Sequence, residues 1–188
     1  MNYQIENTSL SGLYKIHLKI FNDGRGSFME TFRENLFKEM GIKEHFVQDM
    51  TSISKKNVLR GLHYQIENPA GKLIYAARGR MLDVAVDLRI GSKTFGKYES
   101  FELEENDGLQ LYLPPGMAHG FVALDEINEL RYRSTEYYNP EDEAGLFWND
   151  VNVGIDWGVN KSDLIINDRD MNFPVLKAIT RDKLPKLL

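Results

Sequence analysis

The chain has 188 residues, of which 42% are hydrophobic and 27% are charged, and these proportions exclude a disordered or fibrous protein. Its 23 basic and 28 acidic residues give a net charge of −5, without the basic excess of a protein that binds duplex nucleic acid. The chain contains no cysteine, which excludes disulfides, thiolate metal sites and cysteine nucleophiles.

The start of the chain has no basic segment followed by an apolar one, so we expect a cytoplasmic protein. No apolar run approaches the length of about 18 residues that a membrane-spanning helix needs, so we expect no membrane partner. No linker or internal repeat interrupts the sequence, which predicts a single domain over residues 1–188.

One helix is predicted near the N-terminus. Thr31 and Glu34 have the spacing of a capping box, and Leu36 and Met40 continue the helical pattern of apolar residues. Gly41 has the residue type that commonly follows the last turn of a helix.

Most of the remaining chain alternates with a period of two, which is typical of β-strands. Such runs cover residues 82–88, 109–113 and 130–134, and turn signals such as Pro114-Pro115-Gly116 separate them. Short strands at this spacing with few helices predict a sandwich or barrel of antiparallel sheets.

Two segments near the C-terminus are less regular. Residues 142–174 are rich in Asn, Asp and Gly, and we expect them to wrap the barrel rather than form a second domain. Residues 177–188 alternate charged residues with leucine, which is compatible with a short C-terminal helix or with a loose tail.

The first stretch with candidate chemistry is Val-Leu-Arg-Gly-Leu-His-Tyr-Gln at residues 58–65. Strand parity places His63 and Gln65 on one face and Arg60 on the other, and a bulge at Gly61 would bring Arg60 to the same side. His63 is then either a hydrogen-bonded core residue or a general base beside an arginine that holds an anion. The spacing alone leaves both interpretations open.

The second stretch, residues 114–121, has the form P-x-G-x-x-H that small cupin barrels often use. Metal-dependent cupins add a pair of histidines one residue apart and a glutamate, whereas here Gln65 stands where the second histidine would be. A stable transition-metal site needs about three protein ligands, and only His63 and His119 are candidates. We therefore expect no metal and no other cofactor.

Three further positions have two interpretations each. Tyr132 shares the inward face of its strand, where it either packs or donates a proton. Lys72 shares a face with apolar residues and lies at the rim or meets a negative charge. The run Asn167-Asp168-Arg169-Asp170 is an Asx-type turn or a source of carboxylates for a site.

Together these stretches resemble the family of dTDP-4-dehydrorhamnose 3,5-epimerases, which act on nucleotide-linked 4-keto sugars. The resemblance covers about residues 9–172. The segments that carry it are residues 23–32, 46–49, 58–65, 83–89, 115–121, 147–150 and 155–157.

The resemblance implies a mainly β fold, a cupin-type double-stranded β-helix (jelly roll) of antiparallel strands with a few short helices. It implies inversion of C3 and C5 of a nucleotide-linked 4-keto-6-deoxyhexose, foremost dTDP-4-dehydro-6-deoxyglucose. In that reaction His63 matches the general base, oriented by Asp170, and Tyr132 matches the acid on the opposite face of the sugar. Lys72 matches the lysine near the keto oxygen.

The resemblance also implies a binding site for the nucleotide-diphospho sugar. Arg60 matches a residue that contacts the diphosphate, and other pocket positions are matched by Gln48, His119 and Tyr138. Residues presented to the nucleotide by the neighbouring subunit are matched by Arg25, Phe28 and Glu30. The resemblance therefore implies a homodimer with exchanged N-terminal strands.

Some residues depart from the family's pattern. Met50 and Met117 stand where relatives commonly have asparagine and an aromatic residue, which leaves the nucleotide and the sugar open. One alternative is an epimerase that inverts a single carbon. Two others are a metal-dependent cupin with His63 and His119 as ligands, and a sugar-nucleotide-binding cupin without catalysis.

Overall fold

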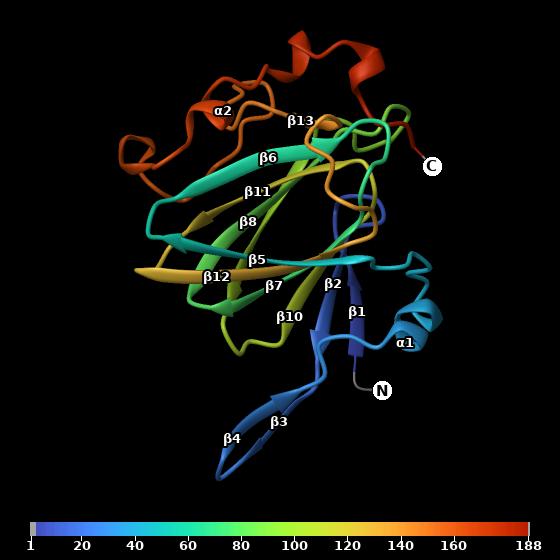
Figure 1. Cartoon of the computed structure of the whole chain (residues 1–188), viewed down its shortest axis with the longest axis vertical. Coiled ribbons are helices and arrows are strands. Elements are labelled where there is room, and N and C mark those ends of the chain that lie inside the picture. Colours follow the sequence, from blue (N-terminus) through green and yellow to red (C-terminus); the bar gives the residue numbers. More distant parts are fainter. Residues whose placement is uncertain (1–2, 188) are drawn as a thin grey trace.

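The computed structural model of the chain describes residues 3–187, which form two antiparallel β-sheets that face each other (Figure 1). The six-stranded sheet has the order β1 (Tyr3–Asn7), β2 (Tyr14–Leu18), β10 (Leu109–Leu113), β7 (Lys72–Arg78), β12 (Ile127–Ser134) and β5 (Gln48–Lys55). The five-stranded sheet has the order β13 (Glu143–Gly145), β6 (Leu59–Gln65), β11 (Met117–Ala123), β8 (Arg80–Asp87) and β9 (Tyr98–Glu104). The mainly β fold of antiparallel strands is confirmed.

The core between the sheets is built by the alternation that the sequence shows. Every second side chain of β7, β10 and β12 points toward the other sheet, as Ile74, Leu111 and Leu130 do. Met81 and Phe121 meet them from β8 and β11. All five are at most 5% exposed, so this end of the sandwich is filled by hydrophobic side chains.

The C-terminal segment covers the outer face of the five-stranded sheet, as predicted (Figure 1). Leu146, Trp148 and Trp157 are buried against Val84 and Val86 of β8. β8 is therefore buried on both faces. The short helices of this segment are η1 (Lys161–Asp163), α2 (Asp168–Met171), η2 (Leu176–Ala178) and η3 (Arg181–Lys183).

The last residues are docked on the sheet rather than loose. The hydroxyl of Tyr64 donates to the carbonyl of Lys183 at 3.0 Å, and the N–H of Ile90 donates to the carbonyl of Pro185 at 2.8 Å. The region contains 3₁₀ turns and no α-helix within residues 177–187, and residue 188 lies outside the described residues.

The predicted helix forms, but its predicted start is wrong. α1 runs from Glu34 to Glu39 with Arg33 at the N-cap, and no side chain caps it. Glu34 instead forms an ion pair with Lys38 and contacts Nδ1 of His45, so it is not available for a capping box. The end is as predicted, since Gly41 follows the last turn with a φ of +96°.

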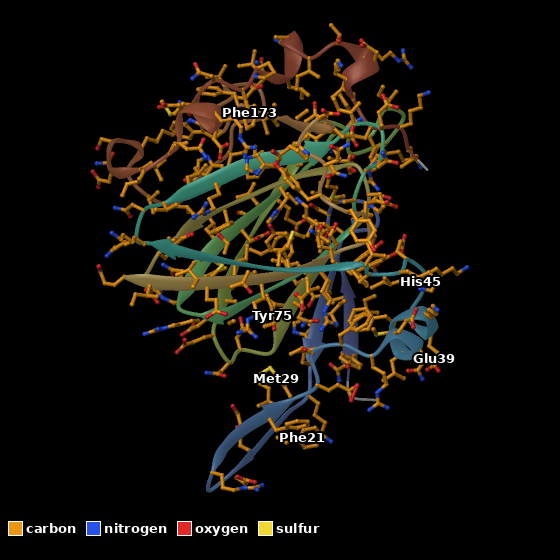
Figure 2. The ribbon with its side chains drawn as sticks, in the orientation of Figure 1. Phe21, Met29, Glu39, His45, Tyr75 and Phe173 are labelled. Carbon is orange, nitrogen blue, oxygen red and sulfur yellow. The ribbon has the colours of Figure 1, made fainter. Side chains whose placement is uncertain are left out.

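A hairpin of β3 (Ile20–Asp23) and β4 (Gly26–Met29) projects from the body of the molecule (Figures 1 and 2). Its aromatic side chains are exposed, with Phe21 at 43% and Phe28 at 68%. Among the described residues, no helix is long and apolar enough to cross a membrane.

Candidate active site

A bulge in β6 brings two candidate residues to the same side of the sheet. His63 pairs with His119 on β11, whereas Arg60 pairs with Phe121, so three steps along β6 match two along β11. Gly61 has a φ of +115°, and a Cβ on it would lie 2.6 Å from the Cα of Gly120. Glycine is required here because the two backbones touch. The bulge predicted at Gly61 is confirmed, and Arg60 and His63 line one cavity.

The cavity lies between the two sheets and consists of two adjoining hollows. The residues that line both hollows are Met50, His63, Lys72, Tyr132, Tyr138 and Glu143. Gln48, Arg60 and His119 line the second hollow. The structure therefore brings together seven of the predicted site residues, contributed by both sheets and by the loop after β12.

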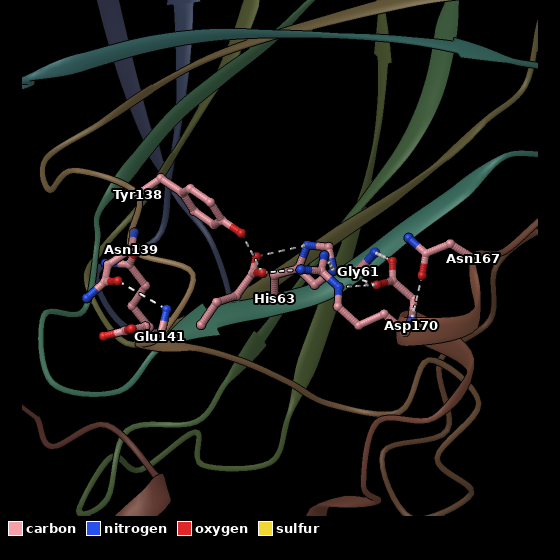
Figure 3. A network of polar contacts seen from close by, with 10 residues as sticks. Gly61, His63, Tyr138, Asn139, Glu141, Asn167 and Asp170 are labelled. Carbon is pink, nitrogen blue, oxygen red and sulfur yellow. Dashed lines mark hydrogen bonds and ion pairs between the residues drawn. The ribbon is translucent and has the colours of Figure 1, made fainter.

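The His63 ring is held by a buried carboxylate from a distant part of the chain (Figure 3). Its Nε2 lies 2.9 Å from Oδ1 of Asp170, and the other oxygen of Asp170 accepts the N–H of Gly61 at 2.8 Å. Burial would raise the pKa of Asp170, but the hydrogen bonds from His63 and Gly61 outweigh it and lower that pKa. Asp170 thus remains ionised and accepts the Nε2–H, which leaves Nδ1 of His63 to take a proton.

Asp170 is placed by the short helix α2. Asn167 caps that helix, and its side chain accepts the N–H of Asp170 at 2.7 Å. The Asx-type turn that the sequence suggests therefore exists, and it delivers Asp170 to the site.

Lys72 is the first residue of β7 and lines both hollows. Burial lowers the pKa of its ammonium group to about 8, although the negative charges of Asp83 and Glu143 act in the opposite direction. The lysine is protonated at neutral pH, and it loses its charge within the range in which enzymes are assayed.

Tyr132 comes from the six-stranded sheet, whereas His63 comes from the five-stranded sheet. A sugar ring bound between the sheets would therefore have the imidazole on one face and the phenol on the other. Burial raises the pKa of Tyr132, with a further contribution from Glu143, so the phenol keeps its proton.

The remaining predicted pocket residues are fixed by hydrogen bonds. Oε1 of Gln48 accepts the N–H of Tyr138 at 2.8 Å, and the Tyr138 hydroxyl donates to Glu143 at 3.0 Å. Nε of Arg60 donates to the Ser54 hydroxyl at 3.1 Å, and the guanidinium remains exposed.

His119 is buried beside a second carboxylate. Its Nε2 lies 2.7 Å from Oδ2 of Asp83, which is fully buried on β8. Burial lowers the pKa of His119, and the positive charges of Lys72 and His63 lower it further, against the opposing effect of Asp83. The ring is therefore neutral at pH 7.

Several residues of the site were not predicted from the sequence. Glu143 lies 3.9 Å from Nδ1 of His63 and also accepts from Arg169, whose guanidinium contacts the His63–Asp170 pair. Phe173 packs edge-on against the His63 ring, with a centroid distance of 5.6 Å. They lie in β13, in α2 and just after α2, in a stretch whose sequence carries no clear period, so only the fold reveals their positions.

Three predicted residues do not lie in this cavity. Arg25 and Phe28 are on the projecting hairpin, where Arg25 pairs with Asp23. Glu30 follows the hairpin and is bound by Tyr3 and Arg33. Within one chain they do not line the cavity that contains His63.

The chain matches known proteins over most of its length. The family model of dTDP-4-dehydrorhamnose 3,5-epimerase matches residues 7–178. A dTDP-4-dehydrorhamnose 3,5-epimerase from Methanothermobacter thermautotrophicus is 44% identical over 171 residues, which cover 90% of this chain and 92% of that protein.

Two solved structures are similar as a whole. The dTDP-6-deoxy-D-glucose-3,5-epimerase from Legionella pneumophila, in complex with dTDP-4-keto-L-rhamnose, has a TM-score of 0.95 at 38% identity, covering 99% of each chain. A 3'-monoepimerase from Streptomyces bikiniensis, in complex with dTDP-quinovose, has a TM-score of 0.88 at 30% identity, covering 96% of this chain and 92% of that one.

Proposed function

Because this chain belongs to the dTDP-4-dehydrorhamnose 3,5-epimerase family and is an isomerase of that kind, we propose that His63 and Tyr132 perform the proton transfers of the epimerisation. The substrate is a dTDP-linked 4-keto-6-deoxyhexose, bound between the two sheets. The single observation that carries this assignment is the placement of the His63–Asp170 pair and Tyr132 on opposite walls of one cavity.

His63 is the general base in this proposal. The C4 ketone makes the hydrogens at C3 and C5 acidic, and the imidazole of His63 removes one of them through Nδ1. Asp170 accepts the Nε2–H, fixes this tautomer and stabilises the imidazolium that forms. Phe173 and Gly61 restrict the movement of the ring and of its carboxylate.

Lys72 stabilises the oxygen that becomes negative when the proton leaves. A charged donor in a buried site is most effective where charge develops, and Lys72 lines the same cavity as His63. Because the chemistry is proton transfer beside a carbonyl, the net reaction requires no redox cofactor.

Tyr132 completes the inversion. Return of the proton from His63 would restore the starting configuration, so a donor on the other face of the ring is required. The raised pKa of Tyr132 keeps the phenol protonated and ready to donate.

The nucleotide side of the substrate is bound at the exposed end of the cavity. Arg60 faces it with an exposed guanidinium whose planar fork suits a diphosphate, and Gln48 and Tyr138 border the same hollow. His119 lines the inner part, beside the sugar.

The test is isotope exchange in D₂O, followed by proton NMR, over a small panel of 4-keto sugar nucleotides. Deuterium should enter at both C3 and C5 of dTDP-4-dehydro-6-deoxyglucose. Absence of exchange with every sugar nucleotide of the panel would contradict the proposal.

A single-carbon epimerase is the second candidate, and the similarity to a 3'-monoepimerase supports it. In that case deuterium enters at one carbon only, in the same assay.

Elemental analysis of the purified enzyme tests the metal-dependent alternative, because a stoichiometric transition metal essential for turnover would favour it.

We also propose that the active form is a homodimer in which the N-terminal hairpin of each subunit reaches the cavity of the other. Support comes from the exposed Phe28 and from the remoteness of Arg25 and Glu30 from the cavity of their own chain.

A cytoplasmic location is part of the proposal, and fractionation of cells tests it.

A further inference from the structure

Asp83 is a buried carboxylate that the proposed reaction does not use. It lies on β8 with no exposed surface, behind two residues that line the cavity, His119 and Lys72. Oδ2 lies 2.7 Å from Nε2 of His119. Within residues 3–187, Oδ1 has no hydrogen-bond partner. A buried oxygen in this state costs free energy, which indicates that the carboxylate serves the charges of the site rather than stability.

The contact with Asp83 decides which nitrogen of His119 carries the proton. Because the ring is neutral and a carboxylate only accepts, Nε2 holds the hydrogen and donates it to Asp83. Nδ1 is then a hydrogen-bond acceptor. In this tautomer His119 has no N–H left to give to a developing oxyanion.

Lys72 is surrounded by groups from four other strands. Asp83 on β8 and Glu143 on β13 favour its charge, and the imidazoles of His119 on β11 and His63 on β6 line the same cavity. Burial disfavours the ammonium form, so the two carboxylates are what maintain it. Glu143 is already shared with Tyr138 and Arg169, which leaves Asp83 as the carboxylate without a competing cation.

We propose that Asp83 is a positioning residue for His119 and Lys72. It holds His119 as the Nε2–H tautomer, whose Nδ1 accepts a hydrogen bond from a hydroxyl of the bound hexose. It also keeps Lys72 charged, so that the ammonium group donates to the keto oxygen. This inference rests on the proposed function. The two residues line the same cavity and have different roles: Lys72 donates to the keto oxygen and His119 accepts from a hydroxyl.

The first experiment reads the tautomer directly in the wild-type enzyme. The chain has only four histidines, so ¹⁵N-histidine labelling gives a small set of ring signals, and a His119→Asn variant assigns the one of interest. Two-bond ¹H–¹⁵N correlations between about pH 6 and pH 9 should show His119 neutral with its hydrogen on Nε2. A hydrogen on Nδ1, or an imidazolium across this range, would overturn the proposal.

The second experiment compares the pH profiles of kcat/KM for wild type and Asp83→Asn. Asparagine keeps the size of the side chain and removes its charge, so the pKa of Lys72 falls and activity is lost at lower pH. We expect the alkaline limb to move down by about one unit, with a smaller change in kcat at the plateau. An unchanged limb in a folded variant would contradict the role.

Asp150→Asn is the matched control. Asp150 is also buried, but its carboxylate accepts the backbone N–H groups of Asn152 and Leu176 in the C-terminal segment. Its replacement should lower Tm and leave the alkaline limb unchanged. If Asp83→Asn does not fold, the tautomer of the wild-type ring still decides the question. Failure of the proposed function appears separately, as absence of isotope exchange in the wild type.

Discussion

At the residue scale, the cavity owes its chemistry to pairs of groups that shift each other's protonation. His63 has its carboxylate partner, Asp170, 107 positions away along the chain, and His119 has its own, Asp83, 36 positions away. His63 and His119 face each other directly across β6 and β11. Two imidazoles thus lie side by side with separate carboxylates, which gives each a defined tautomer.

Replacement of Tyr132 by phenylalanine separates the two halves of the reaction. The variant keeps the base and the cation, so hydrogen exchange with solvent at the carbon beside the ketone should continue, whereas net inversion should fall by about 10²-fold or more. NMR in D₂O measures both rates on one sample. Tyr137→Phe is a suitable control because Tyr137 is 69% exposed. If exchange disappears in folded Tyr132→Phe, the acid has been assigned wrongly.

The pH dependence should report the charge of Lys72. The lysine acts in its protonated form, so kcat/KM should be constant below its pKa and decline as the pH rises through about 8. Lys72→Met should lower kcat by about 10²–10³-fold. In Lys72→Arg the cation persists at high pH, and the decline near pH 8 should vanish from whatever activity remains. Lys177→Arg, at an exposed lysine, should leave the profile as it is in the wild type.

At the scale of secondary-structure elements, β6 is the strand on which the site depends. Its bulge places Arg60 and His63 along one wall, and it also presents the N–H of Gly61 to Asp170. The C-terminal segment then lies over this strand and supplies Asp170 and Phe173 from above (Figures 1 and 2). The base is therefore held from two elements far apart in the chain.

Gly61→Ala should damage both stability and activity. The new Cβ would lie 2.6 Å from the Cα of Gly120 and 2.7 Å from the carbonyl oxygen of His119, at a φ that only glycine adopts readily. We expect the free energy of unfolding to fall by about 3 kcal/mol, as measured by urea denaturation, with loss of turnover.

Gly91→Ala isolates the contribution of the backbone conformation. Gly91 also has a positive φ, +90°, but no atom lies within 4 Å of the position of its Cβ. This variant should lose about 1 kcal/mol and retain full turnover. Equal losses in the two variants would show that the contact between β6 and β11 is unimportant.

At the scale of the whole molecule, the projecting hairpin is the feature that one chain does not explain. β3 and β4 expose Phe21 and Phe28 to solvent, although apolar surface of this kind is usually covered. A partner subunit that places its cavity against this hairpin would bury both rings and bring Arg25 to the nucleotide.

Mixed dimers test this exchange of hairpins. An Arg25→Ala/Phe28→Ala variant keeps His63, and a His63→Ala variant keeps the hairpin, so neither alone should be active. Coexpression of the two should restore about one quarter of wild-type activity, because half of the dimers are mixed and each contains one complete site. If each hairpin served its own chain, no activity would return. One chain has a mass of 21.7 kDa, and analytical ultracentrifugation of the wild type should give twice that mass.

The sequence by itself determined the strands, the bulge at Gly61, the wrapping C-terminal segment and the cavity residues that short motifs carry. These features depend on local periodicity, on glycine's conformational freedom and on compact motifs such as residues 58–65, all readable along the chain. The start of α1 was missed because the side chain of Glu34 pairs with Lys38 and contacts His45 instead of capping the helix.

Only the tertiary structure decided what surrounds the two histidines. Glu143 reaches His63 from the short strand β13, Arg169 from α2 and Phe173 from just after α2, and Asp83 looks in the sequence like one polar residue of an alternating strand. Their effect depends on distances of a few ångströms between residues far apart in the chain and on exclusion of water. Electrostatic interactions strengthen steeply at short distance and where water is excluded, and neither property leaves a local pattern in the sequence.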